Sequence, residues 1–132
     1  MRVLVAVDDS GFAEDLLRAV VTGVRHENTE ALPEMAQGYA PELEDEKQPA
    51  RALVERIAAE LRKAGFTAHT GVRVGDVANT ILGQAAEWGA DLIAVGSHGQ
   101  RSIHDFLLGS VAESVARRAG CSVAIVRGAV KN

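Results

Sequence analysis

The sequence predicts an α/β fold: an open parallel sheet with helices on both faces. Short apolar runs alternate with amphipathic helical segments along most of the chain. Three times, a helical segment ends in glycine and an apolar run begins within two residues, which is typical of parallel strands joined by right-handed crossovers. Only 4% of the residues are aromatic, so the core must be built from Val, Leu, Ile and Ala, which suits strands buried on both faces.

The N-terminal unit is predicted to be a buried strand followed by a helix. The run Val3–Val7 is apolar and rich in β-branched residues, and two acids follow it. Ser10 is suited to cap a helix, and apolar residues then recur every four positions to about Arg25.

No apolar strand is evident after this helix, where a second strand is expected. The residues after Glu27 are rich in acids and include Pro33 and Pro41. Either the strand is truly absent, or the printed sequence omits residues between about Glu27 and Leu32. Losing a central strand would leave the backbone groups of its neighbours without partners, so omitted residues are favoured. Residues 28–46 are expected to include a mobile acidic loop.

The rest of the chain predicts three more helices and three more strands. Glycines end the helices, and Asp76 is suited to cap the second of them. The helices are Arg51–Ala64, the segment after Asp76 as far as Gly89, and Ser110–Ala119; the strands are Phe66–Val74, Leu92–Val95 and Ser122–Arg127.

Composition excludes several classes of protein. The 132 residues fit a single domain, and the net charge of −4 without a long basic run argues against a nucleic-acid or anionic-membrane partner. The one cysteine, Cys121, is expected in the core and cannot form an intrachain disulfide. No apolar run approaches the ~18 residues of a membrane span, and none suits a signal peptide, so a cytoplasmic protein is expected.

The segment Gly96-Ser97-His98-Gly99 … Gly109-Ser110 is the main candidate site. Ligands of open parallel sheets bind beyond the carboxyl ends of the strands, and Gly96 ends a strand. Glycines let a ligand approach the backbone closely, and a helix start supplies free amides and a partial positive charge suited to phosphate. Arg101 lies in the same loop and would add a cation.

Simpler explanations of these residues stay open. Turn chemistry and a capped helix produce the same glycine spacing, and Ser110 with Glu113 fits a capping box. His98 and Arg101 also suit an exposed loop. Asp8, at the end of the first strand, would hydrogen-bond a ribose or hold Mg²⁺, or it is simply exposed before a helix that Asp9 or Ser10 caps.

Other nucleotide and hydrolase motifs are missing. The first strand is followed by Asp8-Asp9-Ser10-Gly11 rather than the glycine fingerprint of a dinucleotide site. The chain contains no Gly-Lys-Ser/Thr of a Walker A loop and no Gly-x-Ser-x-Gly elbow.

The spacing Gly96-x2-Gly99-x9-Gly109-Ser110 resembles the ATP-binding signature of the universal stress protein family. Further segments resemble that family in the same order and together span most of the chain: Val3–Ser10, Val74–Asp76, Gly89–Gly99 and Cys121–Val126. The resemblance implies an adenine-nucleotide α-hydrolase-like sheet of nominal strand order 3-2-1-4-5. It also implies a homodimer that pairs through the last strand, Ser122–Arg127.

The resemblance further implies a set of ligand contacts. Asp8 would contact the ribose or a Mg²⁺ ion, the Gly96–Gly99 loop with His98 would surround the phosphates, and Gly109 with Ser110 and Val111 would hold them. Ala112 lacks the hydroxyl that some members carry at this position. The missing second strand would also leave the adenine pocket incomplete.

The resulting hypothesis is a cytoplasmic, homodimeric, ATP-binding stress-response module with at most slow hydrolysis, because no residue resembles a poised general base. ATP, ADP and AMP are not distinguished. One alternative is a dimeric scaffold of the same family that binds no nucleotide. The other is a phosphoacceptor receiver domain, suggested by the acidic pair Asp8-Asp9.

Overall fold

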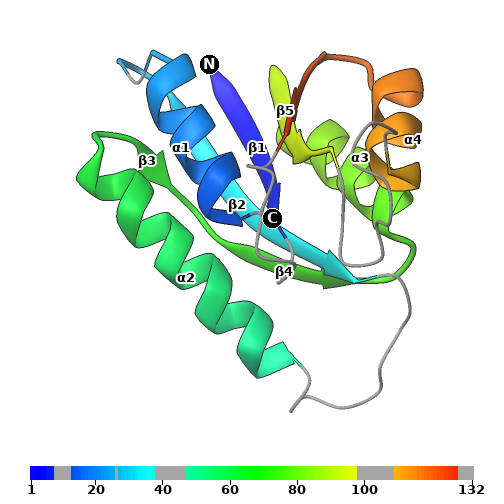
Figure 1. Ribbon diagram of the computed structural model, residues 1–132, viewed down its shortest axis with the longest axis horizontal. Helices are drawn as coiled ribbons and strands as arrows, with labels where there is room; N and C mark the ends of the chain where they lie inside the picture. Colours follow the sequence, from blue (N-terminus) through cyan, green and yellow to red (C-terminus); the bar gives the residue numbers. More distant parts are fainter. Residues whose placement is uncertain (8–12, 26, 38–46, 98–108, 128–132) are drawn as a thin grey trace, which may run out of the picture.

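The computed structural model describes residues 1–7, 13–25, 27–37, 47–97 and 109–127 (Figure 1). Its strands are all paired in parallel, in the order β3-β2-β1-β5-β6, and β4 also pairs with β2. The strands are β1 (Arg2–Val7), β2 (Glu30–Gln37), β3 (Thr67–Ala68), β4 (Gly71–Val74), β5 (Leu92–Gly96) and β6 (Ser122–Val126), and the helices are α1 (Ala13–Gly23), α2 (Lys47–Lys63), α3 (Val77–Trp88) and α4 (Ser110–Arg118). None of these helices is long and apolar enough to span a membrane.

The predicted open parallel sheet and its nominal order are confirmed, with β3 and β4 together taking the place of the nominal third strand. Helices α1 and α2 cover one face, and α3 and α4 cover the other (Figure 1). Side chains alternate along β1, so Val3 and Val5 join the core under α1 and α2 while Leu4 joins the core under α3 and α4. Cys121, expected in the core, is half-buried against the second of these.

The expectation that the second strand is missing from the sequence was wrong. Residues Glu30–Gln37 form β2, which pairs with β1 from Arg2↔Glu30 to Val7↔Met35 and occupies an inner position in the sheet. Residues 30–37 therefore belong to the sheet rather than to the predicted acidic loop, and residues 38–46 lie outside the described part. The acids and the proline within this segment concealed a strand in which Ala31, Leu32, Pro33 and Met35 are nevertheless buried.

Pro33 is tolerated inside β2 because of the side toward which its nitrogen points. The Glu30 N–H donates to the Met1 carbonyl at 2.9 Å, and the Ala31 carbonyl accepts from the His69 N–H at 2.9 Å. Backbone groups of neighbouring residues in a parallel strand point to opposite neighbours, so Pro33 shares the orientation of Ala31. The missing N–H of Pro33 therefore leaves the ladder to β1 intact.

The same geometry explains why one predicted strand appears as two. Ala31 pairs with Ala68 and Glu34 pairs with Gly71. The separation in sequence between the two partners is the same in both pairs. Thus β3 and β4 keep one register against β2, and the break falls opposite Pro33, which has no N–H to donate. The prediction of a single strand over Phe66–Val74 located both β3 and β4 but not this interruption.

Local stop and start signals were confirmed at α3. The Asp76 carboxylate accepts a hydrogen bond from the Asn79 N–H at 3.0 Å, as an N-cap does. Gly89 ends the helix in the left-handed conformation, with φ of 75°. Helix α2 begins at Lys47, one turn before the predicted Arg51, and ends close to the predicted position.

Candidate functional site

Parallel pairing places the carboxyl ends of β1 and β5 side by side at one edge of the sheet. Ala6 of β1 pairs with Val95 of β5, so the chain leaves both strands at the same level. Asp8 follows β1 directly in sequence but lies outside the described residues. Gly96 is the last residue of β5, as the sequence predicts for the phosphate loop.

Two backbone hydrogen bonds at Ser97 connect the end of β5 with β6 and with the start of α4. The Ser97 N–H donates to the Val126 carbonyl at 2.8 Å, which ties the end of β5 to β6. The Gly109 N–H donates to the Ser97 carbonyl at 2.7 Å. Ser97 is only 2% exposed, so this junction is fixed within the fold. The beginning of α4 is therefore held beside the carboxyl end of β5.

The start of α4 has no side-chain cap. Gly109 is the N-cap residue and has extended backbone angles, with φ of −66° and ψ of 157°. Ser110 is exposed and forms the first residue of the helix, so the alternative in which Ser110 caps α4 in a capping box with Glu113 does not hold. Glu113 instead pairs with Arg117 at 2.9 Å. Among the described residues no side chain caps the first amides of α4, and such uncapped amides suit water or an anion.

The structure brings together four of the predicted site residues: Gly96, Gly109, Ser110 and Val111. Val111 is half-buried and packs against the core under α3 and α4, and Ala112 is fully part of that core. The remaining predicted residues, Asp8, His98, Gly99 and Arg101, lie outside the described residues. Within the described part of the chain, no cluster of His, Cys, Asp or Glu is suited to a metal ion.

Comparison with known proteins identifies the family. Residues 1–127 match the model of the universal stress protein family. The chain belongs to this family. A universal stress protein of Synechocystis sp. is 26% identical over 149 residues, which covers 96% of this chain and 97% of that relative. Universal stress protein A homolog 2 of Coxiella burnetii is 41% identical over 80 residues, covering 61% of this chain and 53% of the relative.

Solved structures show the same fold. Protein MJ0577 of Methanocaldococcus jannaschii superposes with a TM-score of 0.84 at 25% identity, covering 98% of this chain and 97% of that one. A universal stress protein from Archaeoglobus fulgidus in complex with dAMP has a TM-score of 0.75 at 25% identity, covering 96% and 97%. A universal stress protein in complex with cAMP has a TM-score of 0.75 at 27% identity, covering 98% of each chain.

Membership of the universal stress protein family, together with the strand order, removes the receiver-domain alternative. A receiver sheet has the order 2-1-3-4-5, whereas β1 here lies between β2 and β5. The acid that follows β4, Asp76, is exposed, and its carboxylate accepts the capping hydrogen bond of α3.

Sequence reasoning missed one notable acid, Glu34 of β2. It is 3% exposed, and neither carboxylate oxygen accepts a hydrogen bond from the residues that the structure describes. Arg73 Nε lies 3.3 Å from Glu34 Oε1. Burial raises the pKa of the Glu34 carboxyl above 4.5, the Arg73 charge opposes this rise, and the charge of Glu87 adds to it. An acid among the buried residues of β2 was the available signal, and it was lost because the strand itself was not recognised.

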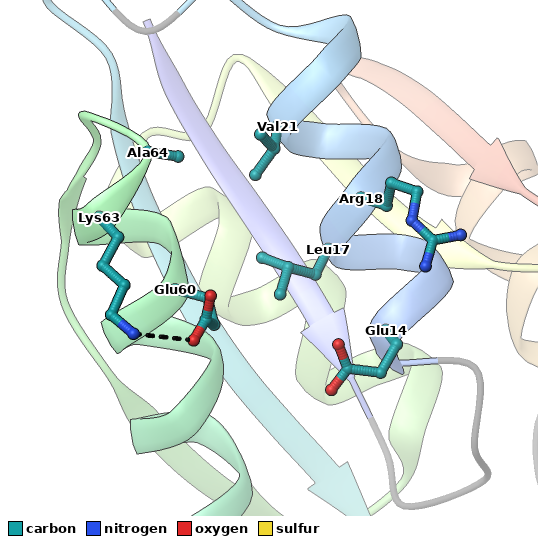
Figure 2. A pocket seen from close by; sticks show the side chains of 7 residues that line it. All are labelled: Glu14, Leu17, Arg18, Val21, Glu60, Lys63 and Ala64. Carbon is teal, nitrogen blue, oxygen red and sulfur yellow. Dashed lines mark hydrogen bonds and ion pairs between the residues drawn. The ribbon is translucent and has the colours of Figure 1, made fainter.

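A groove of about 340 Å³ lies between α1 and α2 (Figure 2). Leu17, Val21 and Ala64 supply its apolar lining. The charged side chains at its margin already have partners within the protein: Glu14 pairs with Arg56, Arg18 with Asp15, and Lys63 with Glu60. The groove contains none of the predicted site residues, so it gives no support to the nucleotide site.

Proposed function

We propose that this universal stress protein binds an adenine nucleotide, with ATP as the expected ligand, at the carboxyl edge of its sheet. The observation that carries the proposal is the 2.7 Å hydrogen bond from Gly109 N–H to the Ser97 carbonyl, which holds the uncapped start of α4 beside the end of β5. Support also comes from the related structures in complex with dAMP and with cAMP.

In the proposed complex, the first amides of α4 and the Ser110 hydroxyl face the phosphates, because an uncapped helix start offers both free donors and a partial positive charge. The glycines at 96 and 99 let the phosphates approach the backbone, with His98 and Arg101 supplying side-chain donors from the same loop. Asp8 binds the ribose or a Mg²⁺ ion that accompanies the phosphates.

The proposed role is that of a nucleotide-dependent regulatory module in the cytoplasm, with at most slow hydrolysis. Nucleotide binding would change what the protein binds rather than drive rapid turnover. The module is proposed to be a homodimer in which β6 pairs with its twin, because β6 is the edge strand of the described sheet and an edge strand can be extended by another strand.

Isothermal titration calorimetry with Mg-ATP tests the proposal. The folded protein should bind, and Gly109→Val should abolish binding because a branched side chain is placed at the phosphate position. Gly83→Val is the matched control, since an added Cβ at Gly83 meets no atom within 4 Å. Circular dichroism establishes that each variant is folded. Absence of heat at millimolar nucleotide with folded wild-type protein contradicts the proposal, as does normal binding by Gly109→Val.

A dimeric scaffold that binds no nucleotide is the second candidate, and it is favoured by Ala112. This position has no hydroxyl, and it is buried in the core. Under that alternative, sedimentation velocity would show a dimer, calorimetry would show no nucleotide binding, and Gly109→Val would leave the dimer unchanged.

A further inference from the structure

An ion pair between a buried glutamate and a half-exposed arginine joins β2 to β4 on the face that α3 and α4 cover. Glu34 pairs with Gly71 across the two strands, and Arg73 lies two residues further along β4 on the same face. Arg73 Nε is 3.3 Å from Glu34 Oε1. The two side chains differ in environment, because that of Glu34 is 4% exposed and that of Arg73 is 48% exposed.

The ionised carboxylate of Glu34 is poorly stabilised in this position. A buried charge needs both a counterion and hydrogen bonds to offset its lost hydration, and within the described part of the chain Glu34 has only the counterion. Solvent screens the half-exposed Arg73. The residue opposite Glu34 on β1, Ala6, carries no charge, and α3 contributes the acid Glu87, which repels the carboxylate.

The pair lies directly against the backbone of β4. A Cβ added to Gly71 would be 3.1 Å from Arg73 Nη1 and 3.4 Å from Glu34 Oε1. Glycine at this position therefore provides the space in which the pair sits. A change in the charge or hydration of Glu34 must act on the contact between β2 and β4, because both side chains of the pair belong to these two strands.

We propose that the Glu34–Arg73 pair makes the pairing of β2 with β4 depend on pH. The pairing is more stable when Glu34 takes up a proton and less stable when Glu34 ionises. The sign follows from linkage. The pKa of Glu34 is raised above 4.5 in the folded protein, so its stabilising contribution is complete below that value and is lost as pH rises through the folded pKa. This pH dependence does not require nucleotide binding, so its test is independent of the test of the proposed function.

Urea unfolding of the full chain without nucleotide, at several pH values between 4.5 and 8, tests this pH dependence. The Glu34→Gln variant keeps the size and shape of the side chain but cannot ionise. The ratio of the folding constant of the wild type to that of Glu34→Gln should fall several-fold as pH rises, because only the wild type loses its proton. Glu60→Gln, at an exposed position of α2, is the matched control and should follow the wild type. A ratio that is independent of pH overturns the proposal.

If Glu34→Gln folds poorly, the pH titration of the Glu34 carboxyl group can be measured directly in the wild-type protein. Carbon-13 NMR should place the midpoint of Glu34 above that of the exposed glutamates. Arg73→Gln should raise this midpoint further, whereas Arg73→Lys, which retains the charge, should change it much less. Amide exchange in β4, corrected for its intrinsic pH dependence, should be slower below the Glu34 midpoint than above it. A midpoint in the ordinary glutamate range, or one that Arg73→Gln leaves unmoved, refutes the proposal.

Discussion

The structure tolerates the proline of β2 at position 33, but a proline one residue earlier should strongly destabilise the protein. Pro33 is fully buried, and its nitrogen faces the break between β3 and β4. The preceding residue, Leu32, has the orientation of Glu30, whose N–H donates to β1 at the Met1 carbonyl. Following this ladder two residues along, the Leu32 N–H faces the Val3 carbonyl. The informative variants are therefore Leu32→Pro and Pro33→Val.

The two changes differ in magnitude because they affect opposite sides of the strand. Leu32→Pro leaves the carbonyl of Val3 buried without a donor, at a cost of about 1–3 kcal/mol. It also replaces a side chain that is 7% exposed with a smaller ring, at about 1–2 kcal/mol. Their sum is a large part of the roughly 5–15 kcal/mol that stabilises a domain. Pro33→Val gains an N–H facing the His69 carbonyl but gives up the restriction of the unfolded chain by proline, so its net effect should stay within about 1 kcal/mol.

Urea unfolding followed by far-ultraviolet circular dichroism gives both free energies by linear extrapolation. Leu32→Pro should lower the unfolding free energy by several kcal/mol or prevent folding, and Pro33→Val should remain close to the wild type. In Pro33→Val, amide exchange at residues 69–71 should also slow, because the new N–H bridges β3 and β4. Equal destabilisation by the two variants would refute the assigned orientation of β2.

Two further predictions concern packing and capping. Leu61 is fully buried and Leu53 is half-buried on the same helix, so Leu61→Ala should cost about 3–5 kcal/mol and Leu53→Ala clearly less, as measured by urea unfolding; equal costs would contradict the burial pattern. Asp76→Ala should lower stability by about 1 kcal/mol through loss of the cap to Asn79, while Asp76→Asn retains most of it; a neutral Asp76→Ala in thermal unfolding would argue against the cap.

Local signals predicted a large part of the fold. The apolar runs of β1, β5 and β6, the four-residue periodicity of α1 and the cap and stop of α3 depend on neighbours in sequence, and each was found where expected. The glycine spacing predicted that Gly96 and Gly109 belong to one phosphate site; this stays a prediction, and the structure holds Gly109 beside Ser97 through a backbone hydrogen bond. The spacing did not distinguish a helix cap at Ser110 from one at Gly109, because both positions are compatible with the same local pattern.

By itself, the sequence determined the fold class, the strand order through family resemblance, and the candidate phosphate segment. Only the tertiary structure decided that Glu30–Gln37 is a strand, because its hydrogen bonds come from β1 on one side and from β3 and β4 on the other. The same distant partners determine why Pro33 is tolerated and why Glu34 is buried without a hydrogen bond from the described residues. The junction between Ser97 and Gly109 also forms only in the folded chain. The periodicity of apolar residues depends only on neighbours in sequence. The hydrogen bonding of backbone groups and the burial of side chains in a sheet depend on segments far away in the chain.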